Sequence, residues 1–109
     1  MTNLEMVAAE LKAAKKKHPH FVDSLFPPRE RYSPEWYDDA LDMARARLAD
    51  AIKLKRCYLH QVLGCEAYEA FAAYAHGDLD HAVQELAQCA AVCIRAMEEV
   101  QKEMEKTKC

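Results

Sequence analysis

The sequence predicts an all-α protein, an antiparallel bundle of about four helices that is completed by oligomerisation. Its 109 residues are enough for one domain, and a hydrophobic fraction of 51% with 30% charged residues is typical of a globular chain. Two glycines and four prolines are too few for the turns of a β-sandwich or barrel. Valine, isoleucine and threonine are scattered, so no β-branched run of strand length supports a parallel sheet.

The N-terminal part of this single domain, residues 1–109, consists of one helix and one irregular segment. Residues 1–17 predict an N-terminal helix, capped by Thr2 or Asn3, with only a thin apolar stripe. Residues 18–33 contain three prolines and cannot continue that helix. A segment of this length is uncommon unless it covers something, so we interpret it either as a structural strap over the bundle or as a lid over a ligand.

Residues 34–106 form the predicted helical core. A Ser-Pro dipeptide is typical of a helix start and opens a helix expected over 34–53. After a short polar break, a third helix is expected over about 57–76 and a fourth over about 78–106, with Gly77 ending the third. The first of these core helices should bury one apolar face, made of Tyr37, Leu41, Ala44, Leu48, Ala51 and Ile52.

Charge and cysteine content restrict the partners and the compartment. The formal net charge of −3 provides no basic excess for binding a nucleic acid polymer, and no segment approaches the length of an apolar membrane span. The N-terminus lacks the basic and apolar regions of a signal peptide. An odd number of cysteines without a CxxC motif predicts buried free thiols in a reducing cytoplasm, at Cys57, Cys65, Cys89, Cys93 and Cys109.

Residues 86–97 of the expected fourth helix are apolar nearly all round. Gln88 and Arg95 are the two strongly polar residues in this stretch. A helix of this kind must be surrounded by other apolar surface, and four helices from so short a chain do not easily surround it. We therefore expect a homodimer or homotetramer assembled through helices.

The core also contains carboxylates at helical spacing. Glu66 falls in the middle of the apolar stripe of the third helix and Glu69 on its edge, where a carboxylate is costly unless it is paired or bound to a metal. The fourth helix presents Glu85 and Gln88 at the same i, i+3 spacing. A short turn between antiparallel helices brings the two pairs to comparable heights, which predicts a site of hard oxygen ligands suited to Mg²⁺ or Mn²⁺.

Two other interpretations concern the same region. A purely structural one pairs the glutamates with the arginines Arg45, Arg47 and Arg56. A di-iron centre would need Glu-x-x-His motifs on two helices, whereas Asp78 and His81, the one acid-x-x-His pair, lie at the turn. His60 and His76 fall on the flanks of the third helix, where partly buried histidines with satisfied hydrogen bonds are expected rather than ligands.

These paired motifs, ExxE at Glu66 and Glu69 and ExxQ at Glu85 and Gln88, resemble the signature of the MazG-like all-α nucleoside triphosphate pyrophosphohydrolases. That superfamily includes dUTPases and phosphoribosyl-ATP pyrophosphohydrolases, and its signature is ExxE, a helix-turn and ExxD. The closest match is CEAYEAFAAYAHGDLDHAVQELAQCAAV, residues 65–92, and the chain is similar to the short MazG-like proteins of phages and prophages. The sequence departs from the signature at Gln88, which replaces the fourth carboxylate and reduces the charge available to a metal.

The resemblance implies conversion of a nucleoside or deoxynucleoside triphosphate to the monophosphate and pyrophosphate. Glu66, Glu69 and Glu85, together with Gln88, would hold Mg²⁺, with Mn²⁺ as a possible substitute, and Glu66 and Glu69 would take part in catalysis. Basic side chains would bind the phosphates, and an aromatic side chain would stack on the base. The candidates for substrate binding are Arg95, Lys53, Lys55, Arg56 and Trp36.

Several alternatives stay open. Arg95 either faces the ligand or forms an ion pair at an oligomer interface, and Trp36, Phe21 and Tyr32 either stack on a base or belong to the core. The main alternative to the enzyme is a non-catalytic helical dimer that binds a nucleotide or a protein partner through the same cleft, an interpretation that Gln88 favours. A purely structural oligomerisation module is the third.

Overall fold

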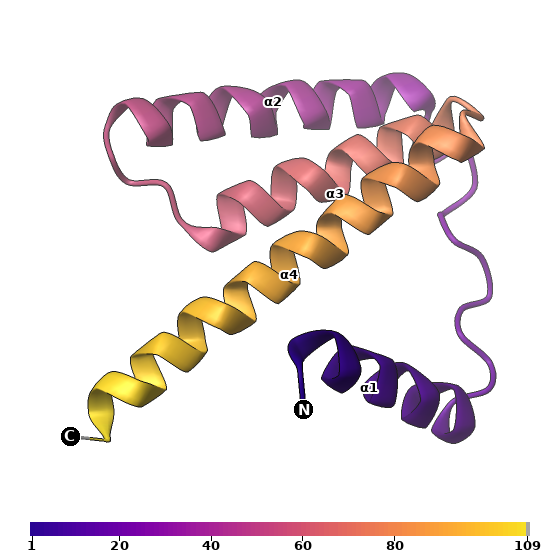
Figure 1. Ribbon diagram of the computed structural model, residues 1–109. Coiled ribbons are helices and arrows are strands. Elements are labelled where there is room, and N and C mark those ends of the chain that lie inside the picture. The colour runs from indigo at the N-terminus through magenta and orange to yellow at the C-terminus, as the bar shows by residue number, and fades with distance from the viewer. Residues whose placement is uncertain (109) are drawn as a thin grey trace.

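The computed structural model describes residues 1–108, which form four helices and no strand. The helices are α1 (Asn3–Lys17), α2 (Pro34–Lys53), α3 (Leu59–Ala75) and α4 (Leu79–Thr107). Figure 1 shows α2 and α3 side by side, α4 crossing α3 obliquely, and α1 beside the C-terminal half of α4. The prediction of an all-α bundle is confirmed, and none of the helices in the described part of the chain could span a membrane.

Side-chain caps start three of the four helices where the sequence predicts. The Thr2 hydroxyl accepts the backbone N–H of Glu5, and the Glu5 side chain accepts that of Thr2. Ser33 caps α2 by accepting the N–H of Trp36 at 3.2 Å. Asp78 caps α4 by accepting the N–H of His81 at 3.2 Å. Each cap satisfies a backbone donor that has no partner inside its helix.

The start of α3 and one apolar face differ from the prediction. α3 begins at Leu59 rather than at about Cys57, because the Gln61 side chain accepts the backbone N–H of Tyr58 at 2.7 Å and fixes Tyr58 as the cap. Ile52, predicted to be buried, retains 59% of its exposure. The reason is that α2 packs against α3 alone among the helices of residues 1–108, so its last turn has no second neighbour.

The core lies between α2 and α3. The buried residues of α3 are small, namely Cys65 and three alanines. Buried Tyr37 and Leu41 of α2 meet Cys65 and Ala72 of α3. The irregular segment 18–33 adds Phe26 to this core, where its ring contacts three aromatic rings at centroid distances of 4.8 to 5.3 Å: Tyr37, Phe71 and Tyr74. This part of the segment therefore packs as a strap does, whereas Phe21 is 84% exposed.

α1 is docked by few contacts, and most of the cysteines are more exposed than predicted. α1 has no buried residue and touches only α4 among the helices of the described chain, through two hydrogen bonds between the side-chain amides of Asn3 and Gln101. The prediction of buried thiols holds for Cys65 alone, since Cys89 is partly exposed and Cys57 and Cys93 are exposed. They are exposed because no helix covers the connection before α3 or this side of α4; Cys109 lies outside the described residues.

Candidate functional site

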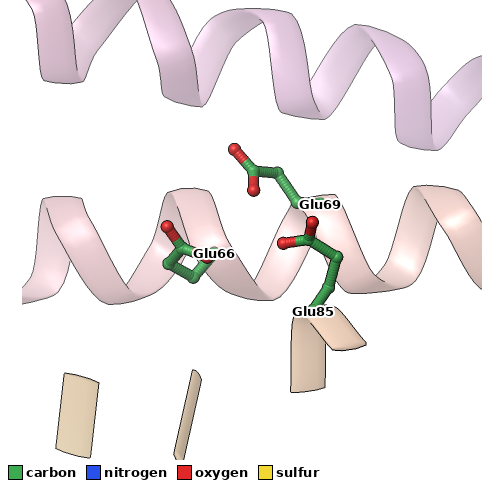
Figure 2. A group of neighbouring side chains, drawn as sticks. All are labelled: Glu66, Glu69 and Glu85. Atoms are coloured by element: carbon green, nitrogen blue, oxygen red, sulfur yellow. The ribbon is translucent and has the colours of Figure 1, made fainter. Parts of the chain in front are cut away.

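Three carboxylates converge where α3 and α4 face each other. Glu66 and Glu69 are one turn apart on α3, and Glu85 comes from the second turn of α4 (Figure 2). One carboxylate oxygen from each lies within 4.8 Å of the others. The structure therefore brings together the three glutamates that the sequence singles out, and it does so through the tight turn at Gly77, which folds α4 back along α3.

These carboxylates are withdrawn from water. Glu85 retains 7% of its exposure, and Glu66 and Glu69 are partly buried. Burial raises the pKa of Glu66, and the neighbouring Glu85 carboxylate raises it further. Burial also raises the pKa of Glu69, with added contributions from Glu85 and Glu66, whereas Arg45 acts in the opposite direction. The site therefore concentrates negative charge in a place where a cation would relieve it.

Gln88, the fourth residue of the predicted ligand set, lies against the carboxylates. With its amide nitrogen facing them, it donates to Glu66 Oε2 at 2.9 Å and to Glu85 Oε2 at 3.3 Å. A glutamine amide has both donors and an acceptor, so the same side chain can present its oxygen when the amide is turned over. Gln88, which the sequence places in the ligand set, is thus also in direct contact with two of the glutamates.

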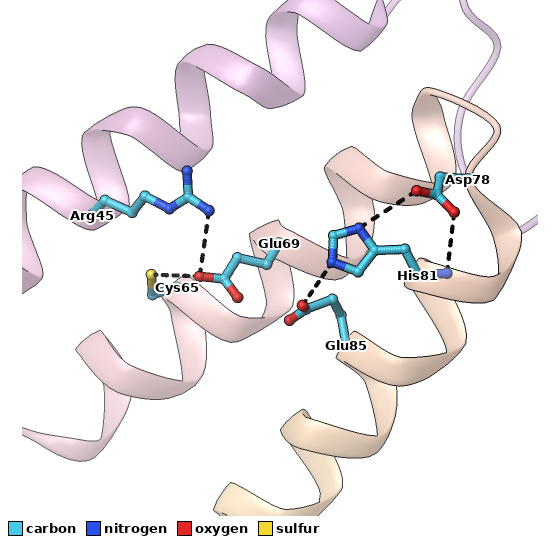
Figure 3. Close-up of polar contacts among 6 residues, drawn as sticks. All are labelled: Arg45, Cys65, Glu69, Asp78, His81 and Glu85. Carbon is cyan, nitrogen blue, oxygen red and sulfur yellow. Dashed lines mark hydrogen bonds and ion pairs between the residues drawn. The ribbon is translucent and has the colours of Figure 1, made fainter.

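Other side chains contact two further carboxylate oxygens, Oε1 of Glu69 and Oε1 of Glu85 (Figure 3). Arg45 of α2 lies 3.6 Å from Glu69 Oε1, and the Cys65 thiol donates to the same oxygen over 3.7 Å. His81 Nε2–H donates to Glu85 Oε1 at 2.9 Å, and the backbone N–H of His81 donates to Asp78. Of the predicted ion-pair partners, Arg45 alone is paired with one of these glutamates in the described residues.

Two histidine contacts are not among the sequence-based predictions. His81 and Glu85 stand at i, i+4 on α4, a spacing that places them on one helix face and that could have revealed the pair. His76 forms the hydrogen bonds that the sequence predicts, but it is exposed rather than partly buried, and its partner, Asp38 of α2 at 2.9 Å, is new. That partner is 38 residues away in the sequence, so only the packing of α2 on α3 identifies it.

None of the five predicted substrate-binding residues forms a hydrogen bond or an ion pair with the three glutamates within residues 1–108. Trp36 packs against Tyr32 and Tyr37 at the start of α2. Lys53 ends α2, and Lys55 occupies the turn after it with a φ of 57°. The last two line separate grooves: Arg95 lies in one with Leu59, Glu98 and Glu99, and Arg56 lies in another with Tyr58, Cys65 and Tyr68.

The donor set fits a small hard cation. Mg²⁺ takes oxygen ligands in an octahedron at about 2.1 Å, so opposite ligands are about 4.2 Å apart. Carboxylate oxygens that already lie within 4.8 Å reach that arrangement through small side-chain movements. The Gln88 amide oxygen and solvent would complete the coordination. Thiol ligation is disfavoured, because burial raises the pKa of Cys65 and of Cys89 and keeps both thiols protonated.

Comparison of the chain with protein-family models, with curated proteins and with solved structures finds no match.

Proposed function

We propose that this chain is a metal-dependent nucleoside triphosphate pyrophosphohydrolase, which converts a nucleoside or deoxynucleoside triphosphate to the monophosphate and pyrophosphate. The observation that carries the proposal is the convergence of Glu66, Glu69 and Glu85 within 4.8 Å across two helices. Three partly desolvated carboxylates at this separation repel one another, and a divalent cation offsets that repulsion. The ExxE and ExxQ spacing that resembles the MazG-like signature supports the choice of nucleotide chemistry.

In this proposal the three glutamates and Gln88 hold Mg²⁺ or Mn²⁺. When bound there, such an ion would supply polarisation of the phosphate oxygens and a lowered pKa of water. Glu66 and Glu69 also act in the chemical step, where one of their oxygens accepts a proton from the attacking water. The water oxygen bonds to the α-phosphorus, the bond from that phosphorus to the bridging oxygen breaks, and pyrophosphate leaves with the electron pair.

The desolvation of the site suits this role. Without metal, burial and the neighbouring carboxylates raise the pKa of Glu66 and of Glu69, so each ionised carboxylate is stabilised when a cation binds beside it. His81 and Arg45 restrict the rotation of Glu85 and Glu69 through their contacts at 2.9 and 3.6 Å. Oriented carboxylates lose less rotational freedom when a ligand arrives.

The proposal includes a homodimer or homotetramer. From Leu86 to Val100, α4 has no fully buried residue, although this stretch is largely apolar. A groove of about 540 Å³ runs along it between Leu59, Leu63, Met97 and Met104. A second copy that packs there would bury this surface and complete the bundle.

One observation favours a second candidate, a non-catalytic helical dimer that binds a nucleotide or a protein partner through the same cleft. Gln88 replaces the last acid of the motif, and in the free protein its amide hydrogen-bonds two of the three glutamates. A neutral donor in this place stabilises the carboxylates without a metal. The first candidate is preferred because Arg45 is the one permanent cation that contacts the three carboxylates in the described residues, and the neutral amide of Gln88 does not cancel their charge.

Turnover of a panel of ribo- and deoxyribonucleoside triphosphates separates the two. The enzyme should release pyrophosphate with Mg²⁺ or Mn²⁺ and none with EDTA. Glu66→Gln should abolish release and weaken Mn²⁺ binding, measured by electron paramagnetic resonance, while the metal-free fold stays intact or becomes more stable. Glu98→Gln, an exposed glutamate of α4, is the matched control and should behave as the parent does.

If nucleotides raise the melting temperature but no pyrophosphate is released with either metal, the non-catalytic candidate takes its place. If Glu66→Gln unfolds the chain and the parent does not respond to metal, Glu66 is a structural ion-pair residue and both candidates fail.

A further inference from the structure

A cavity borders the carboxylates on the side of α2. It has a volume of about 290 Å³ and lies between α2, α3 and the first turns of α4. Its lining includes three carboxylates, those of Glu69, Asp78 and Glu85. The nitrogen donors around it come from Arg45, His76 and His81. Ligand pockets are usually about 300 to 1,000 Å³, so this one suits a short anionic chain rather than a whole nucleotide.

Arg45 lines this cavity and has hydrogen-bond donors that no other side chain engages closely. Its side chain is 56% exposed, and its one ionic contact is the single 3.6 Å approach of one terminal nitrogen to Glu69. A guanidinium has five N–H donors in a planar fork that matches phosphate oxygens two at a time. Most of these donors are therefore free to bind a second anion.

The two histidines are more fully engaged. His76 is bonded to both oxygens of Asp38 at 2.9 Å. His81 lies between Glu85, at 2.9 Å, and Asp78, at 3.7 Å. Carboxylates therefore already contact both ring nitrogens of His81 and the Nε2 of His76, so Arg45 has the largest number of donors left for a new partner.

We propose that this cavity is the subsite for the substrate's phosphate chain and that Arg45 is its anion-binding side chain. The inference rests on the proposed function, since the adjoining carboxylates are taken as the metal site. It also replaces Lys53, Lys55, Arg56 and Arg95 in the phosphate-binding role, because none of these lines the cavity.

A coupling between cation and anion follows from the shared residue Glu69. In the free protein Glu69 and Arg45 partly neutralise each other across 3.6 Å. When the Glu69 carboxylate binds a metal cation instead, Arg45 loses this partner. The attraction of Arg45 for phosphate then increases. Binding of metal and of phosphate should therefore be mutually favourable.

Calorimetric titration of the full chain with inorganic pyrophosphate, with and without MgCl₂, tests the subsite. In the parent, pyrophosphate should bind more tightly with Mg²⁺. Arg45→Met should weaken this binding about tenfold to a hundredfold, as expected for the loss of charge-assisted hydrogen bonds. Arg45→Lys should be intermediate, because lysine keeps the charge but not the fork. Arg47→Met, the same change nearby on α2 but outside the cavity, should match the parent.

Mn²⁺ affinity, measured separately by electron paramagnetic resonance, distinguishes anion binding from a merely structural role. Removing a cation beside the carboxylates should leave Mn²⁺ binding unchanged or strengthen it, whereas a collapsed site would weaken it. If Arg45→Met fails to fold, the pyrophosphate affinity of Arg45→Lys is compared with that of the parent instead.

Failure of the phosphate subsite and failure of the proposed pyrophosphohydrolase activity give different results. Pyrophosphate binding that is absent in the parent, or equal in the parent and Arg45→Met, overturns the subsite even if the parent hydrolyses nucleotides. A parent that neither binds Mn²⁺ nor hydrolyses nucleotides overturns the proposed function, whereas pyrophosphate binding that still depends on Arg45 would uphold the subsite.

Discussion

At the scale of single residues, the molecule places neutral and cationic groups around carboxylates that repel one another. Gln88 donates to Glu66 and Glu85, and Arg45 lies beside Glu69. A hydrogen bond to a charged group contributes about 1.5 to 3 kcal/mol when its partner would otherwise be unsatisfied. These contacts reduce the electrostatic cost of the site without removing it, as the raised pKa values of Glu66 and Glu69 indicate.

Gln88→Asp should convert this arrangement into a stronger metal site. The substitution removes two hydrogen bonds and adds a fourth negative charge, so the metal-free protein should lose about 1 to 3 kcal/mol of unfolding free energy. Mg²⁺ should bind more tightly, because ligand charge is a main determinant of affinity for hard cations. The measurement is the melting temperature with EDTA and with Mg²⁺. Gln84→Asp, an exposed position on α4, controls for the added charge. Equal Mg²⁺ affinity in the parent and Gln88→Asp would place Gln88 outside the coordination sphere.

The raised pKa values also predict how stability depends on pH. The folded-state pKa of Glu66 and that of Glu69 lie above the ordinary 4.5, so the native state holds protons that the unfolded state releases. Their contribution to stability is therefore fully present below pH 4.5 and is lost as the pH rises through the raised values. Without metal, Glu66→Gln should be more stable than the parent at neutral pH, and this advantage should shrink towards about pH 5. A difference in melting temperature that stays constant with pH would contradict the assignment.

At the scale of elements, two turns of the same design end α2 and α3. In each, two backbone N–H groups beyond the helix bond back to its last carbonyls: Lys55 to Ile52 and Arg56 to Ala51, and Gly77 to Tyr74 and Asp78 to Ala73. The residue at the centre of each turn is left-handed, with φ of 57° at Lys55 and 81° at Gly77. Glycine adopts this conformation freely, whereas the Cβ of lysine is strained in it.

Adding a side chain at Gly77 and removing the one at Lys55 should have opposite effects on the free energy of unfolding. Gly77→Ala should destabilise the protein by about 1 kcal/mol, because a Cβ is strained at this φ. Lys55→Gly should stabilise it by about 0.5 kcal/mol, since relief of strain exceeds the added freedom of the unfolded chain. Urea unfolding measures both. The nucleotide affinity of Lys55→Gly also tests the predicted role of Lys55 in substrate binding. Unchanged affinity would mean that Lys55 serves only in the turn. A loss of stability in Lys55→Gly would contradict the strain assigned to this turn.

At the scale of the whole molecule, the described chain exposes more surface than a compact protein of its mass. Its accessible surface is 8,890 Å², whereas a compact monomer of 12.4 kDa exposes about 6,100 Å². Its radius of gyration is 16.7 Å, against about 13 Å for a compact domain of this length. Figure 1 shows the reason, since α4 extends well beyond the α2–α3 pair and only α1 accompanies its far half. The excess is of the size that obligate oligomers bury.

A stable oligomer at micromolar concentration is the expected state. Val100→Asp should dissociate it, because Val100 lines the apolar groove along α4 and would carry a charge into the interface. In a monomer the same change at a 55% exposed position would be close to neutral. Sedimentation velocity of the parent and of Val100→Asp measures this. A parent that sediments as a folded monomer would contradict the prediction.

Local patterns predicted most of the helical architecture and the convergence of the three glutamates. The caps at Ser33 and Asp78 and the turn at Gly77 act within a few residues, so the sequence reveals them directly. The i, i+3 spacing of Glu66 and Glu69 fixes one side of the carboxylate cluster, because helical periodicity places them a turn apart. The short turn makes the meeting with Glu85 predictable as well.

By itself, then, the sequence determined the all-α class, the places where α2 and α4 start, and the carboxylate cluster, since each depends on contacts between chain neighbours or across one short turn. Tertiary structure alone decided which contacts α2 makes around the cluster. Arg45 reaches Glu69, and Asp38 reaches His76, through the packing of α2 on α3, and these pairs are 24 and 38 residues apart. It also decided which predicted cations pair with the cluster. Arg45 does, whereas Lys53, Lys55, Arg56 and Arg95 form no ion pair with the three glutamates in residues 1–108. An ion pair between two helices depends on how the helices pack, which side-chain spacing along one helix does not encode.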